Sequence, residues 1–181
     1  FPEGIWYDLF TGEKVVGGST KTVEALLDEI PVYIASGAVM PITLSDTTLK
    51  LSDSISGTGR SALLITPPTT EKTTEFFTDT TSDPTTYSIA PTSGNSFKIT
   101  SNGSNQSNLM VVYGTSATSV VCDGAGLSKL SSMPTDVNVS GYYVDSASGF
   151  TYIALPTTDW KSVTVTDSSL ENFYWLINIS H

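Results

Sequence analysis

Few residues in this chain have the type and spacing that catalysis usually requires. The 181 residues include one cysteine, Cys122, and one histidine, His181. Cys122 stands in the run SVVCDG with no histidine near it in sequence, so we expect a small buried strand residue rather than a reactive thiol. His181 is the last residue, and a histidine at a chain end is seldom held in the fixed geometry that catalysis needs. These two residues therefore predict no catalytic site.

Carboxylates are abundant, but their spacing does not select a catalytic pair. The chain has 18 Asp and Glu residues, so some pair will be close by chance and we nominate none as a general acid and base. Asp79 and Asp83 in TDTTSDP could offer oxygens to calcium, but they lack the glycine and the final glutamate of an EF-hand loop. Solvated loop acids are the preferred interpretation, and we predict no metal and no cofactor.

The charge balance excludes two classes of partner. Only 8 Lys and Arg residues oppose the acids, and the formal net charge is -10. Nucleic acids and anionic lipid surfaces are bound by clustered Lys and Arg, which this sequence lacks. No apolar run approaches the roughly 18 residues that a membrane helix needs. We therefore expect neither a nucleic-acid partner nor a membrane partner.

Aromatic residues are the candidates for sugar binding, because an apolar sugar face packs well on a large ring. Trp6, Trp160 and Trp175, with Tyr142, Tyr143 and Tyr152, could form such a platform. Core or interdomain burial is the alternative, and we favour it for Trp6. Trp160 lies in the polar run TTDWKS, which makes it the first candidate for a sugar-binding surface residue.

Four Asn-x-Ser sequons are candidate glycosylation sites, at Asn102, Asn105, Asn138 and Asn178. Together they agree with a secreted or extracellular protein, with a lysosome-like compartment as an alternative location. In a chain so rich in serine and threonine, each sequon could also arise by chance.

The pattern along the chain predicts an all-β fold, because short runs rich in Val, Ile, Tyr, Phe and Thr alternate with turn clusters. We expect strands at 5–8, 14–16, 32–35, 48–54, 61–66, 74–78, 86–90, 96–101, 108–113, 119–122, 142–145, 150–155, 162–167 and 174–178. Two hairpins stand out, with Gly12 and Gly149 at the positive-φ position of their turns. TVEALLDEIP allows one helical turn before Pro31. The polar change after IPVYIASGAVMPI places a boundary near residue 47.

The first 41 residues carry a specific resemblance. FPEGIWYDLFTGEKVVGG followed by IPVYIASGAVMPI resembles the C-terminal part of glycoside hydrolase family 31, the α-glucosidase family. The match falls on Pro2, Gly4, Trp6, Tyr7, Asp8, Thr11, Gly12, Glu13, Gly17, Gly18, Ile30, Pro31, Val32, Gly37 and Pro41. Farther along, SGYYVDSASGFTYIALP and WKSVTV look like the last strands of the family's distal sandwich, although Asp79 lacks the adjacent Asp and Gly of the family pattern.

The resemblance implies two antiparallel β-sandwich domains. Residues 1–47 would be the C-terminal part of a proximal sandwich, incomplete without upstream polypeptide, and residues 48–181 would be the distal sandwich. An incomplete sheet would leave edges and an apolar face uncovered, so we expect the first segment to be held to a larger catalytic chain of the same enzyme.

The function implied is that of a non-catalytic portion, fragment or processed subunit, of a retaining hydrolase acting on α-linked glucosides. The family's two catalytic Asp residues lie on the barrel, and its nucleophile motif does not occur here, so we expect no catalytic residue in this chain. The alternative is a freestanding carbohydrate-binding β-sandwich module.

Overall fold

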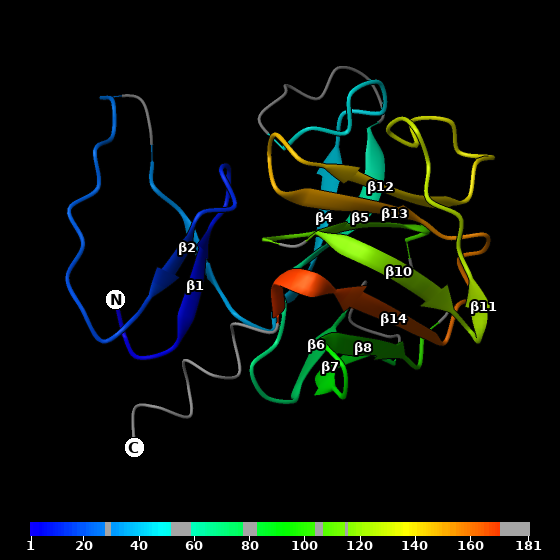
Figure 1. Cartoon of the computed structure of the whole chain (residues 1–181), viewed down its shortest axis with the longest axis horizontal. Helices are drawn as coiled ribbons and strands as arrows, with labels where there is room; N and C mark the ends of the chain where they lie inside the picture. Colours follow the sequence, from blue (N-terminus) through cyan, green and yellow to red (C-terminus); the bar gives the residue numbers. More distant parts are fainter. Residues whose placement is uncertain (28–29, 52–58, 78–82, 104–106, 115, 171–181) are drawn as a thin grey trace.

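The computed structural model describes residues 1–27, 30–51, 59–77, 83–103, 107–114 and 116–170. Its regular structure is almost entirely β, as predicted, with one short 3-10 helix at Ser168–Leu170. The strands form three sheets of three, six and five strands. In Figure 1 the small sheet lies to one side of a sandwich made by the two larger sheets.

The small sheet has the order β2-β1-β3 and is antiparallel throughout. Its strands are β1 (Ile5–Asp8), β2 (Lys14–Val16) and β3 (Tyr33–Ala35). The β1–β2 turn has the predicted glycine, since Gly12 has a φ of 70° and its N–H donates to the Asp8 carbonyl at 3.0 Å. A side chain at that φ is strained, so glycine fixes the turn.

The six-stranded sheet has the order β11-β10-β14-β8-β7-β6, and every pairing in it is antiparallel. Its strands are β6 (Lys72–Phe76), β7 (Thr85–Thr92), β8 (Ser96–Ser101), β10 (Ala117–Cys122), β11 (Ala125–Gly126) and β14 (Ser162–Asp167). Strand β14 alternates between half-buried and buried side chains. One face of such a strand packs on the core and the other lies toward solvent.

The five-stranded sheet has the order β12-β13-β9-β5-β4. Its strands are β4 (Val39–Leu44), β5 (Arg60–Ile65), β9 (Leu109–Val112), β12 (Gly141–Asp145) and β13 (Phe150–Ala154). The pairing of β5 with β9 is parallel, and the other pairings are antiparallel. The chain leaves β5, builds β6 to β8 in the other sheet and returns at β9, which gives the crossover that parallel strands require.

The core lies largely between the two sheets of the sandwich, but β9 and β13 are buried along their whole lengths. Side chains of a strand point alternately to opposite faces. A strand with every residue buried is therefore covered on both faces. Part of the second cover comes from the small sheet, as the contacts described below show.

Strand β4 was not predicted, and its position explains why. Pro41 interrupts the run, and proline cannot donate to a β ladder, but β4 is an edge strand in which that loss is tolerated. The strand predicted at 48–54 is wrong in its described part, where residues 46–48 form a turn and Leu49 takes a φ of 56°. The strand predicted at 174–178 lies outside the described residues.

The chain changes sheets between β3 and β4, because β4 pairs with β5 and not with the small sheet. Residues 39–44 therefore share a sheet with the rest of the sandwich. A change of sheet is not by itself a domain boundary, and the boundary near residue 47 stays a prediction.

The predicted helical turn before Pro31 is not present in residues 22–27 or at residue 30, the described part of that segment. Leu27 and Ile30 are exposed instead. An amphipathic helix this short depends on an apolar surface to pack against. The described chain does not bring such a surface to this segment.

Replacing Gly17 by alanine is expected to destabilise the small sheet. A Cβ at Gly17 would lie 1.8 Å from the Pro2 carbonyl oxygen, so the ends of β1 and β2 must move apart, at a cost of roughly 1–3 kcal/mol. Hydrogen exchange of β1 and β2 measures this cost. Gly126→Ala is the control, because no atom lies within 4 Å of its Cβ position; equal effects of the two changes would contradict the prediction.

Candidate functional site

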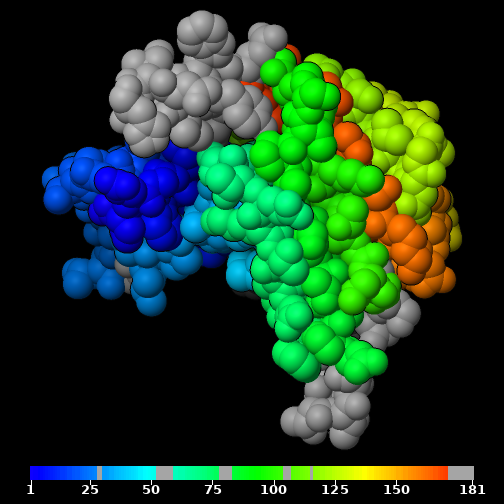
Figure 2. Space-filling view, turned by 90° about the horizontal axis from the view of Figure 1, so that it is seen from below, coloured from blue at the N-terminus to red at the C-terminus, as the bar shows by residue number. Residues whose placement is uncertain are grey.

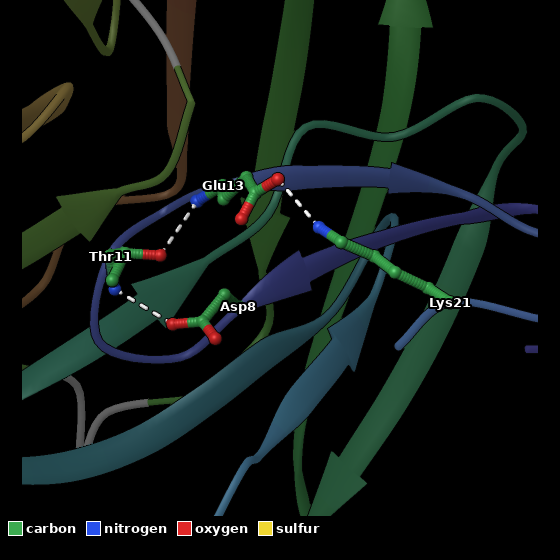
Figure 3. A network of polar contacts seen from close by, with 4 residues as sticks. All are labelled: Asp8, Thr11, Glu13 and Lys21. Atoms are coloured by element: carbon green, nitrogen blue, oxygen red, sulfur yellow. Dashed lines mark hydrogen bonds and ion pairs between the residues drawn. The ribbon is translucent and has the colours of Figure 1, made fainter. Parts of the chain in front are cut away.

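The β1–β2 turn carries the polar network of the family-like motif, shown in Figure 3. One oxygen of Asp8, Oδ1, accepts hydrogen bonds from the backbone N–H of Phe10 at 2.9 Å and of Thr11 at 2.8 Å. Thr11 Oγ1 accepts from the N–H of Glu13 at 3.2 Å. These bonds are internal to the turn, as expected for an Asx-type turn. The motif's Asp8 and Thr11 therefore shape the backbone.

Glu13 forms an ion pair with Lys21, with 2.6 Å between Oε1 and Nζ. The hydrogen bond to Glu13 raises the pKa of Lys21 above its ordinary value. Both side chains are substantially exposed, and an exposed pair of this kind contributes little to stability. Its main effect is to tie the segment after β2 to the turn.

Three aromatic side chains gather on the small sheet. The ring of Phe1 lies 4.7 Å from that of Tyr33, edge to face, and 6.1 Å from that of Trp6. Trp6 is half-buried and its Nε1 donates to the Pro2 carbonyl at 3.0 Å. The partial burial agrees with the preference for Trp6 as a packing residue. Trp175 lies outside the described residues.

A cluster of contacts joins the small sheet to the five-stranded sheet. Tyr113, next to β9, donates its hydroxyl to the Leu9 carbonyl, and its ring lies 4.6 Å from that of Phe150, edge to face. Phe150 in turn packs so closely on Gly12 that a Cβ there would be 2.7 Å from its ring. The pKa of Tyr113 is raised, mainly by burial. The phenol therefore stays protonated and keeps its hydrogen-bond donor.

A second set of contacts lies at the β3–β4 connection. Ser36 Oγ donates to the Pro67 carbonyl at 2.7 Å, and Lys72 Nζ donates to the Ser36 carbonyl at 2.5 Å. Thr66 Oγ1 donates to the Ala35 carbonyl at 2.7 Å and accepts from the Ala38 N–H at 2.8 Å. Figure 2 shows the blue N-terminal segment as a lobe beside the segment that contains β6. The small sheet is thus attached to the sandwich at two places.

Trp160 lies in the core. Its indole is 0% exposed, stacks on Tyr87 at 6.1 Å between ring centroids and donates from Nε1 to the Ser107 carbonyl at 3.0 Å. The exposed ring face that a sugar platform requires is absent at this residue. The prediction that Trp160 is a surface residue is therefore wrong. It was based on the polar neighbours in TTDWKS, which are at the surface although the ring between them is buried. Tyr142 and Tyr152 are buried as well.

Two of the four sequon asparagines are described, and both are exposed. Asn102 uses Oδ1 to accept from the Thr86 N–H at 2.7 Å. Asn138 donates from Nδ2 to Asp136 Oδ1 at 3.1 Å. Asn105 and Asn178 lie outside the described residues, and glycosylation of all four stays a prediction.

The described residues contain no group of three or more His, Cys, Asp and Glu side chains placed to hold a metal ion. Asp83 is exposed, while Asp79 and His181 lie outside the described residues.

Cys122 is buried. Burial is the main cause of the raised pKa of its thiol, and the charge of Asp123 is the second cause. A raised pKa leaves the unreactive thiol form at neutral pH. In the described part of the chain, no helix is long and apolar enough to cross a membrane.

The architecture defines the class of the protein as a β-sandwich with an attached three-stranded sheet. Residues 1–40 match the model of the glycosyl hydrolase family 31 C-terminal domain. An α-xylosidase of Saccharolobus solfataricus is 51% identical over 37 residues, which are 20% of this chain and 5% of the enzyme. An isomaltosyltransferase of Sporosarcina globispora is 26% identical over 159 residues, 85% of this chain and 14% of that protein. Residues 1–40 therefore carry a C-terminal segment of glycoside hydrolase family 31.

A solved structure shares the fold over most of the chain. The cycloalternan-forming enzyme from Listeria monocytogenes, in complex with a pentasaccharide substrate, has a TM-score of 0.74 and 24% identity. The similarity covers 92% of this chain and 16% of that enzyme. The chain thus spans only a small part of each relative.

Replacing Trp160 by alanine is expected to lower the free energy of unfolding by about 3–5 kcal/mol, because a fully buried ring and its hydrogen bond are lost. Urea unfolding followed by the exchange of β7 and β8 amides measures the change. Val137→Ala, at an exposed valine, is the control and should have little effect. A Trp160→Ala protein as stable as the parent would show that the ring is not in the core.

Proposed function

We propose that this chain is the non-catalytic C-terminal portion of a retaining, α-glucosidase-like glycoside hydrolase. The observation that supports this most is the match of residues 1–40 to the family 31 C-terminal domain. The chain would support a catalytic barrel formed by other polypeptide, and it would contribute neither the nucleophile nor the general acid.

The contacts of the motif acids favour a structural role. A retaining glycosidase needs two carboxyl groups about 5–5.5 Å apart across the scissile bond. In the motif, Asp8 is held by the backbone of its own turn and Glu13 is paired with Lys21. Neither arrangement leaves a pair of carboxylates facing a substrate.

The names of two relatives support a proposal for the substrate class. Isomaltosyl groups are α-linked glucosides, and an α-xylosidase acts on an α-linked sugar. We therefore propose α-linked glucosides as substrates of the whole enzyme.

A secreted or extracellular location, with a lysosome-like compartment as the alternative, is part of the same proposal. It is supported by the exposed sequon residues Asn102 and Asn138.

The partner we propose is the larger catalytic polypeptide of the same enzyme, docked on residues 10–32, which run from the β1–β2 turn to the start of β3. Ten large apolar side chains are exposed in the described part of the chain, and seven of them lie in residues 10–32. These seven are Phe10, Val16, Val23, Leu26, Leu27, Ile30 and Val32. Exposed apolar groups gathered in one segment are typical of an interaction surface. The relatives have the additional polypeptide that could cover it, since this chain spans 14% and 16% of two of them.

The activity of the full-length protein tests the function. It should release glucose from p-nitrophenyl α-D-glucopyranoside, with the α-anomer appearing first by NMR, whereas the β-glucoside serves as the control substrate. The 181-residue chain alone should be inactive. Activity in the chain alone, or a full-length protein inactive on every α-linked glucoside, would contradict the proposal.

Native and denaturing mass spectrometry of the protein purified from its source test the partner. If the chain is a processed subunit, a larger chain should accompany it and separate only on denaturation. Leu27→Ser with Ile30→Ser should weaken that association at least about tenfold by loss of apolar burial, and Val137→Ser should not. A lone species at the mass of this chain would favour the freestanding carbohydrate-binding module instead.

A further inference from the structure

Two buried polar atoms at the junction of the small sheet and the sandwich lack hydrogen-bond partners. Tyr7 comes from the centre of the small sheet, and Asp167 ends β14 of the six-stranded sheet. Both side chains are 0% exposed. In the structure neither the Tyr7 hydroxyl nor Asp167 Oδ2 has a partner among the described residues. Buried polar atoms are rarely left in this condition, because each costs free energy.

The two groups lie at neighbouring points of one stretch of chain, because the Tyr7 ring packs against Gly114 and Asp167 pairs with Ala117, three residues farther on. Burial is the main cause of the raised pKa of the Tyr7 phenol, and the negative charge of Asp167 is the second cause. The phenol is therefore protonated and carries a donor, whereas an ionised carboxylate only accepts. Donor and acceptor are complementary, and they come from different sheets.

Each group is also held in place by other contacts. Asp167 Oδ1 accepts from Ser169 N at 2.7 Å and Ser169 Oγ at 2.6 Å, and the Asp167 N–H donates to the Asn95 carbonyl at 2.9 Å. The Tyr7 ring packs against Gly114, where a Cβ would be 2.7 Å from the ring. Neither side chain can turn to solvent without breaking these contacts, so the simplest partner of both is one water molecule between them.

We propose that one buried water molecule bridges the Tyr7 hydroxyl and Asp167 Oδ2 by hydrogen bonds, which fixes the small sheet on the sandwich. Tyr7 is a positioning residue in this account. It belongs to the motif that matches the family, whereas Asp167 lies outside that match. The bridge would therefore join the motif to the sandwich, and the inference does not depend on the proposed substrate or partner.

A double-variant cycle in the full-length protein tests the bridge. Tyr7→Phe removes the donor and should speed hydrogen exchange of the β1 amides by up to about tenfold, the loss expected for one buried hydrogen bond. Asp167→Asn keeps an oxygen for Ser169 but removes the charge, and it should speed the same amides. The double variant should match the Tyr7→Phe variant. Additive effects of the two changes would overturn the proposal.

Two further measurements separate this bridge from a general loss of stability. Tyr142→Phe is the matched control, because Tyr142 is also buried but donates its hydroxyl to the Thr118 carbonyl within the sandwich; it should leave the β1 amides unchanged. In a high-resolution crystal structure, Tyr7 Oη and Asp167 Oδ2 should bond to the same water. An apolar side chain between them would overturn the proposal even if the variants were unstable.

Discussion

The burial of both faces of the five-stranded sheet at β9 and β13 is the constraint on which the rest of the structure depends. The six-stranded sheet covers only one face of the five-stranded sheet, so a further layer is required on the other face. The β1–β2 hairpin supplies part of that layer through the contacts of Gly12 with Phe150 and of Leu9 with Tyr113. The family-like motif is therefore an integral part of the packing of the sandwich.

The local features of the sequence predicted much of the fold. The bounds expected for β1, β2, β8 and β14 agree with the structure, and Gly12 and Gly149 take positive φ as expected. These features depend on neighbouring residues, on strand alternation and on turn chemistry. Strand β4 and the parallel pairing of β5 with β9 were not predicted, because they depend on which distant strand lies alongside. A proline also obscured the pattern of β4.

The candidate site was predictable as a motif but not as a set of contacts. The spacing of Trp6, Tyr7, Asp8 and Thr11 was enough to suggest the family, and residues 1–40 match its C-terminal domain. The burial of Trp160 was not predictable, because its flanking residues are polar while its ring, in the loop before β14, stacks on Tyr87 of β7. The contacts of Tyr113 and Asp167 were not predictable either, because the partners of these buried polar groups lie far away in the sequence.

The small sheet is held on the sandwich through its buried side, whereas most of the exposed apolar side chains of residues 10–32 lie in the connection between β2 and β3, the proposed contact with the catalytic polypeptide. Carbene footprinting of the full-length protein tests this directly by comparing Leu27 and Ile30 with Val137, all of which are exposed in the structure of this chain. The account predicts that Leu27 and Ile30 are protected while Val137 is labelled. Equal labelling of all three would contradict it.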